Sequence, residues 1–133
     1  MSGSTREKLF LKRLSDAFVC LIEVGLVYRR IRATAHEYEV RYANRRQAVR
    51  ITLERQWSYQ YLFVQFYRRN EGGEWIPVSY LDSWLAQQGW EQEAILALLK
   101  CPQPVMSLSD AEQVEFLEKA AKVVCASARQ IFG

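Results

Sequence analysis

Hydrophobic residues recur at helical intervals of three and four near both ends of the chain, and at intervals of two in the middle. At the N-terminal end the helical spacing runs over positions 11–22. Ser4 and Glu7 have the spacing of a capping box, in which each end of the pair satisfies a free backbone N–H group. Gly25 favours the left-handed turn that commonly ends a helix. The pattern predicts a helix over residues 5–24.

The C-terminal end carries the longest helical pattern in the chain. Ser109 and Glu112 form a second capping box. Apolar residues then step by three and four as far as Ile131, which predicts a helix over residues 110–131. Two shorter helices are expected before it, one from Ser79 to Gly89 and one over residues 91–99.

The middle of the chain predicts an antiparallel sheet of four strands. Apolar and polar residues alternate there, as in strands with one buried face. Pro77 cannot donate a backbone hydrogen bond, so it places the last strand at the sheet edge. Residues 28–32 are interpreted as a short basic connection. The predicted strands cover residues 37–42, 49–54, 59–67 and 75–78.

The order of these elements indicates an α+β fold in a single domain, residues 1–133. It consists of an N-terminal helix, a four-stranded antiparallel meander and C-terminal helices packed on the sheet. The strand over 59–67 is apolar on both sides, which is typical of a central strand whose second face is also covered. The sequence leaves open whether a helix covers that second face.

Charge is distributed unevenly along the chain. Residues 1–70 hold 14 basic and 6 acidic residues, whereas residues 71–133 hold 4 basic and 9 acidic ones, within a net charge of +3. This asymmetry favours an anionic partner, or pairing between the two halves of different copies. No stretch is apolar enough to cross a bilayer and no signal peptide is recognisable, so we expect a cytoplasmic protein without a membrane partner.

The three cysteines, Cys20, Cys101 and Cys125, are odd in number and widely spaced. This is not the pattern of a disulfide framework. Free cysteine behaves as a small hydrophobic residue, and Cys20 and Cys125 lie on apolar helix stripes. We therefore predict buried free thiols.

The sequence carries little catalytic chemistry. His36 is the single histidine, and no cysteine motif accompanies it, so neither a metal site nor a cofactor site is predicted. Glu37 and Glu39 share one strand face, where ion pairs with arginine are a better interpretation than metal binding or proton transfer. No catalytic residue is predicted, and we expect a non-enzymatic protein.

Arginine and tyrosine are enriched on and around the predicted sheet, and both dominate the energetics of protein interfaces. An ordinary solvated face accounts for any single arginine, and core packing for about half of the aromatic residues. As a group they still indicate a partner-binding surface. Its candidate residues are Arg41, Arg45, Arg46, Arg50, Arg55, Tyr59, Tyr61 and Tyr67.

Two further interpretations stay open. An acidic surface on the helices would suit a basic partner; it includes Asp82, Glu91, Glu93, Asp110, Glu112, Glu115 and Glu118. Arginines interleaved with aromatics are also compatible with a nucleic-acid-binding regulator, although no recognition motif is present. A homodimeric adaptor, as opposed to a monomer, would pair the basic half of one copy with the acidic half of another.

The stretches FVCLIEVGLVYRR, YEVRYANRRQAVRITLERQWSYQYLFVQFYRR and VSYLDSWLAQQGW lie in order between Phe18 and Trp90. Their pattern of hydrophobicity and turns resembles small bacterial immunity proteins of polymorphic toxin and contact-dependent inhibition systems. The resemblance implies a cytoplasmic, non-enzymatic protein that neutralises a cognate toxin by binding it and occluding its active site. It assigns no functional residue, and it does not extend to residues 91–133.

Overall fold

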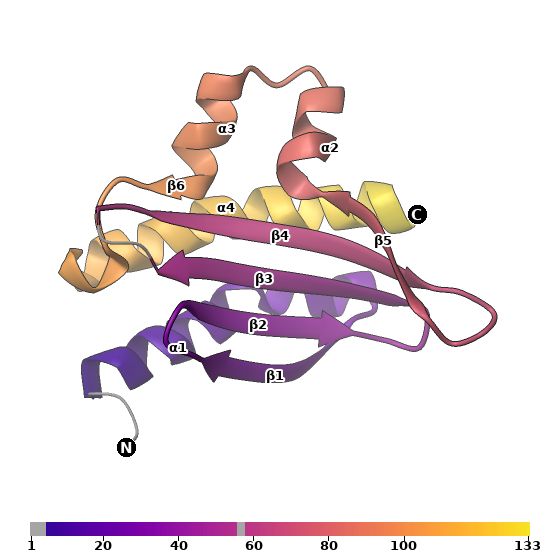
Figure 1. The fold of residues 1–133 in the computed structure, drawn as a ribbon, viewed down its shortest axis with the longest axis horizontal. Helices are drawn as coiled ribbons and strands as arrows, with labels where there is room; N and C mark the ends of the chain where they lie inside the picture. The colour runs from indigo at the N-terminus through magenta and orange to yellow at the C-terminus, as the bar shows by residue number, and fades with distance from the viewer. Residues whose placement is uncertain (1–4, 56–57) are drawn as a thin grey trace.

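The computed structural model describes residues 5–55 and 58–133. It consists of an antiparallel sheet with helices on one face and at one edge (Figure 1). In chain order the elements are α1 (Thr5–Ala17), the 3-10 helix η1 (Val19–Val24), β1 (Val27–Ala33), β2 (Glu37–Ala43), β3 (Gln47–Arg55), β4 (Gln60–Arg69), β5 (Trp75–Tyr80), α2 (Leu81–Gln87), α3 (Gln92–Leu99), β6 (Lys100–Cys101), the 3-10 helix η2 (Val105–Ser107) and α4 (Asp110–Phe132).

The predicted α+β fold is confirmed, but the expected number of strands is wrong. The described sheet has six strands in the order β1 to β5, with the two-residue β6 paired to β4. The missed strand, β1, occupies the segment that was predicted as a connection. It is an edge strand, mostly exposed and rich in arginine, so it lacks the alternation of apolar and polar residues that reveals a half-buried strand. Its pairing with β2 makes it a strand.

The N-terminal helix is shorter than predicted. α1 ends at Ala17 and the chain continues as the 3-10 helix η1, in which Leu21 N donates to Phe18 O at 3.0 Å. Apolar spacings of three and four suit both helix types, so the pattern did not separate them. Gly25 adopts the left-handed conformation expected of it, with φ of 94°. The predicted capping residue Ser4 lies outside the described residues.

Helices α1 and α4 lie against the same face of the sheet, behind the strands in Figure 1. Three strands bury alternate side chains toward them, in agreement with the predicted period of two. These inner residues are Tyr38, Val40, Tyr42, Val49, Ile51, Leu53, Leu62, Val64 and Phe66. The capping box at the start of α4 is also confirmed, because Ser109 accepts from Glu112 N and Glu112 accepts from Ser109 N.

Helices α2 and α3 stand beyond the edge of β4 rather than on a face of the sheet (Figure 1). β5 covers only residues 65–69 of β4, and β6 covers only Gln60 and Tyr61, which leaves the middle of that edge to α2. β5 is itself an edge strand, as Pro77 predicts.

A series of hydrogen bonds links η2 to β4 and to α4, and links α4 to α1. Gln60 of β4 accepts from Val105 N at 2.5 Å, and Gln113 of α4 donates to Val105 O at 2.7 Å. Arg13 of α1 donates to the side-chain oxygen Oε1 of Gln113 at 2.6 Å. Both glutamines are buried, so these bonds satisfy polar groups that would otherwise be costly to remove from water.

Cys20 and Cys125 are joined by a disulfide, so the prediction of free thiols is wrong for this pair. They are 105 residues apart in sequence, and the packing of η1 against α4 brings their Cα atoms to 6.2 Å. Cysteine count and spacing carry no information about such a contact. Cys101 is free and buried as predicted, and burial raises the pKa of its thiol.

Reduction of the disulfide is expected to lower the free energy of unfolding by about 3 kcal/mol, because a long covalent loop restricts the unfolded chain. Urea unfolding of the Cys20→Ser variant against the parent protein measures this loss. Cys101→Ala serves as the control for removing a thiol. Equal midpoints for Cys20→Ser and the parent would contradict the expectation.

Candidate protein-binding surface

The face of the sheet opposite α1 and α4, called here the outer face, carries no helix among the described residues (Figure 1). The two-sided apolar pattern of β4 left open whether a helix covers the second face of that strand. β4 is central, between β3 and β5, but no helix of the described residues covers its second face. Side chains on this face therefore either stabilise one another or meet solvent.

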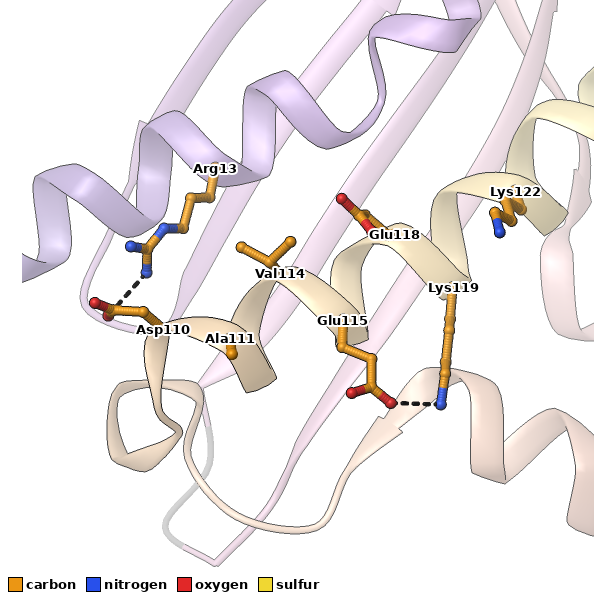
Figure 2. Close-up of a pocket in the computed structure, with 8 residues that line it drawn as sticks. All are labelled: Arg13, Asp110, Ala111, Val114, Glu115, Glu118, Lys119 and Lys122. Carbon is orange, nitrogen blue, oxygen red and sulfur yellow. Dashed lines mark hydrogen bonds and ion pairs between the residues drawn. The ribbon is translucent and has the colours of Figure 1, made fainter.

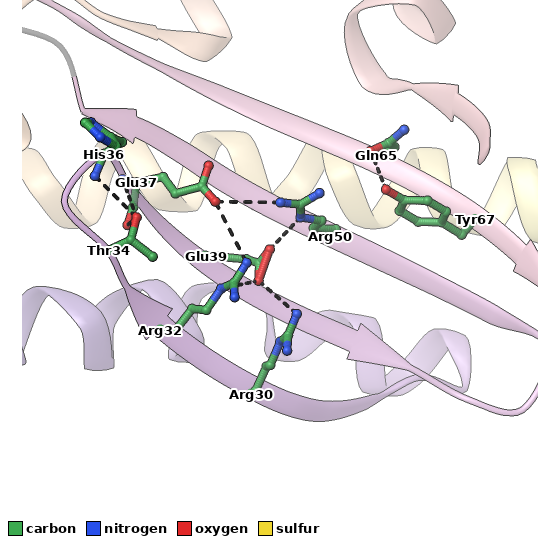
Figure 3. A network of polar contacts seen from close by, with 9 residues as sticks. All are labelled: Arg30, Arg32, Thr34, His36, Glu37, Glu39, Arg50, Gln65 and Tyr67. Atoms are coloured by element: carbon green, nitrogen blue, oxygen red, sulfur yellow. Dashed lines mark hydrogen bonds and ion pairs between the residues drawn. The ribbon is translucent and has the colours of Figure 1, made fainter. Parts of the chain in front are cut away.

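Glu39 is the centre of the outer face and is fully buried there by arginine side chains (Figure 3). Its carboxylate accepts from Arg32 Nε at 2.9 Å and from Arg50 Nε at 2.5 Å. Arg30 Nη2 lies 3.3 Å from the same group. The expected ion pairing of this carboxylate is confirmed, and it ties together β1, β2 and β3.

Glu37 lies beside this cluster, and its ion pairs with the arginines are longer than those of Glu39. Its carboxylate is 3.6 Å from Arg50 and 4.0 Å from Arg32, and its side chain is partly exposed. His36 lies in the adjacent β1–β2 turn, where its backbone N–H donates to the Thr34 hydroxyl at 3.3 Å. Within the described ranges, no group of three or more His, Cys, Asp or Glu residues could hold a metal ion.

The pKa of Glu39 reflects two opposing effects. Burial raises it, but the hydrogen bond from Arg50 and the charges of Arg50, Arg32 and Arg30 outweigh burial and leave the pKa below the ordinary glutamate value. Glu39 therefore remains ionised to lower pH than a free glutamate. Its charge neutralises arginines that would otherwise repel one another across three strands.

Aromatic side chains of β4 form a second part of the outer face. The Tyr61 and Phe63 rings are 4.7 Å apart between centroids, and Phe63 is exposed. Burial, together with the charge and hydrogen bond of Asp82 in α2, raises the pKa of Tyr61. Tyr67 donates to Gln65 at 2.5 Å, and Lys100 lies over the exposed Tyr59 ring at 4.7 Å.

The structure separates the arginines that were predicted as one binding group. Arg50 forms ion pairs with Glu39 and Glu37. Arg41 lies over the Trp75 ring at 5.6 Å, and Arg45 lines the same open recess as Arg41. Arg46 lies in the same turn but does not line that recess. Arg55 pairs with Gln60 through the backbone, and its side chain lies outside the described part of the structure.

Sequence reasoning missed four arginines that belong to this face: Arg29, Arg30, Arg32 and Arg69. The first three lie on β1, whose strand character was not recognised. Arg30 and Arg32 are nonetheless spaced by two, and that spacing was the available signal. Arg69 lies over the Trp75 ring at 5.3 Å, a contact between two strands that no local pattern reveals.

The part of the competing acidic surface that lies along α4 is balanced by basic residues beside it. An open hollow of about 570 Å³ lies along α4. Arg13 of α1 reaches Asp110 there at 3.1 Å, and Lys119 reaches Glu115 at 2.8 Å (Figure 2). Three acidic and three basic side chains line the hollow. A surface with so little net charge gives weak electrostatic attraction to a basic partner.

Comparison of the chain with protein-family models, with curated proteins and with solved structures found no significant match. The resemblance to immunity proteins therefore stays a prediction. No helix in the described part of the chain is long and apolar enough to cross a membrane.

Replacing Glu39 by glutamine is expected to lower the free energy of unfolding near pH 7 by about 2 kcal/mol, because it leaves three arginines without their shared counter-charge. The partial exposure of those arginines keeps the loss below that of a fully buried pair. Glu37→Gln is the matched control, and its more distant contacts predict a smaller loss. Chemical denaturation of both variants measures the difference.

The same substitution is expected to change the pH dependence of stability. A carboxyl with a lowered folded pKa stabilises the fold above the ordinary glutamate pKa of about 4.3, and that stabilisation is lost as pH falls through the folded pKa. Denaturation midpoints measured from pH 6 to pH 3 should fall less steeply for Glu39→Gln than for the parent. Parallel curves would contradict the assigned role of Glu39.

Proposed function

We propose that this protein is a non-enzymatic binding module of the immunity type, which uses the outer face of its sheet to occlude the active site of a protein toxin. The observation that carries the proposal is an aromatic pair, exposed Phe63 and partly buried Tyr61, on a sheet face that no helix of the described residues covers. Aromatic side chains beside arginines are typical of the residues that contribute most to protein interfaces.

The arrangement of the outer face supports protein binding in a second way. The Glu39 cluster ties β1, β2 and β3 together, and β4 pairs with β3 along residues 60–68, so the aromatic pair on β4 is presented on a rigid sheet. Little conformational entropy is lost when such a surface binds. Unpaired positive charge elsewhere on the outer face would accelerate and select the encounter with an acidic partner.

Phe63→Ala is expected to weaken binding of the partner about 30-fold, the loss typical of a central interface residue. Affinity capture from the native host identifies a partner, and calorimetry with the purified pair measures the change. Trp90→Ala is the matched control, because Trp90 is 37% exposed against 36% for Phe63 but follows α2, away from the outer face. Equal affinity in the parent and in Phe63→Ala would contradict the proposed surface.

The immunity role has a separate readout. The captured partner should impair growth when produced alone, and the parent protein should restore growth more effectively than Phe63→Ala. Arg50→Glu is unsuitable as a probe, because it would place a second carboxylate against buried Glu39. A partner without toxicity would contradict the immunity role, and a nucleic-acid partner with steeply salt-dependent binding would contradict the protein-binding function.

A further inference from the structure

Five arginines from three strands and a turn line one open recess at the end of the outer face, where β1 begins and β2 ends. The recess, called here the arginine recess, has a volume of about 380 Å³. Its charged and aromatic lining consists of Arg29, Arg30, Arg41, Arg45, Arg69 and Trp75.

No acidic side chain among the described residues lines the arginine recess. Arg30 reaches Glu39 at 3.3 Å, but the closer bonds to Glu39 come from Arg32 and Arg50, outside the recess. The outer face therefore has a neutralised half around Glu39 and a half whose positive charge is uncompensated. Fixed positive charges without a counter-charge are strongly favourable for a bound anion.

Trp75 organises two of these arginines. The guanidinium carbons of Arg41 and Arg69 lie 5.6 Å and 5.3 Å from the centre of its ring, within the range of cation–π contact. A hydrogen bond from Arg69 Nε to Gly73 O at 2.9 Å also fixes the position of the Arg69 side chain. A guanidinium that lies over an aromatic ring keeps N–H groups at its edge available to an oxyanion, and their planar geometry matches a carboxylate.

The surroundings favour carboxylates on a protein over the phosphates of a nucleic acid. A nucleic-acid strand carries a charge at every nucleotide and would continue along the face past Glu37 and Glu39. An acidic protein segment can place carboxylates in the recess and apolar groups on Phe63. The small volume of the recess also suits a few side chains rather than a polymer backbone.

We infer that the arginine recess binds a cluster of Asp or Glu carboxylates on an acidic segment of the partner protein. The inference rests on the proposed function and adds to it the chemistry of the partner. It assigns Arg45 and Arg41 to binding, Arg69 and Trp75 to positioning, and Arg50 to the stability of the sheet.

The test uses two neighbouring arginines in the β2–β3 turn, both exposed, of which only Arg45 lines the recess. A fluorescein-labelled hexaglutamate peptide is titrated into the full-length protein at low ionic strength and followed by fluorescence anisotropy. Arg45→Glu should weaken binding about tenfold, whereas Arg46→Glu should weaken it less than about twofold despite the same change in net charge. Arg45→Gln, checked for folding by circular dichroism, should weaken binding to an intermediate extent.

Two further probes set the specificity. Hexaglutamine should not bind, and deoxyhexathymidylate should bind more weakly than hexaglutamate. Equal losses in Arg45→Glu and Arg46→Glu, failure of hexaglutamate to bind the parent, or tighter Arg45-dependent binding of deoxyhexathymidylate would each overturn the inference.

The native complex separates this inference from the proposed function. A complex lost in Phe63→Ala but unchanged in Arg45→Glu would overturn the role of the recess and leave the proposed function standing. Arg45-dependent peptide binding together with a partner that contacts neither Tyr61 nor Phe63 would support the recess and contradict the proposed function.

Discussion

The packing of α1 and α4 on the same face of the sheet is the constraint on which the rest of the structure depends. Alternate residues of β2, β3 and β4 are buried beneath these two helices, and the disulfide between Cys20 and Cys125 links η1 covalently to α4. With both long helices on one side, no second layer of the described residues covers the outer face. Its charged and aromatic residues therefore either contact one another or face solvent, where a partner can reach them.

Glu39 accounts for part of these contacts. One buried carboxylate collects bonds from Arg30, Arg32 and Arg50, so much of the arginine content around it stabilises the sheet. The arginines without a counter-charge lie toward the other end of the outer face, around Trp75. The number of arginines in the sequence therefore overstates the binding site, and the pairing of each arginine determines whether it is available to a partner.

Sequence reasoning succeeded where a periodic pattern was long and locally complete. α4 and the strands β2 to β4 were predicted closely, because burial of one face imposes a period that is visible in the residues themselves. β1 was missed because an exposed edge strand needs no apolar period. α1 was extended too far because Leu14, Phe18 and Leu21 suit an α-helix and a 3-10 helix equally well.

The sequence by itself determined the α+β class, the inner residues of the central strands, the edge position of Pro77 and the pairing of a carboxylate with arginines on one strand face. Each of these follows from local spacing and from the chemistry of neighbouring residues. Only the tertiary structure decided that no helix of the described residues covers the outer face, that Cys20 meets Cys125, and that Arg41 and Arg69 both lie over Trp75. These depend on distances between segments far apart in the chain, which are set by how helices and strands pack together.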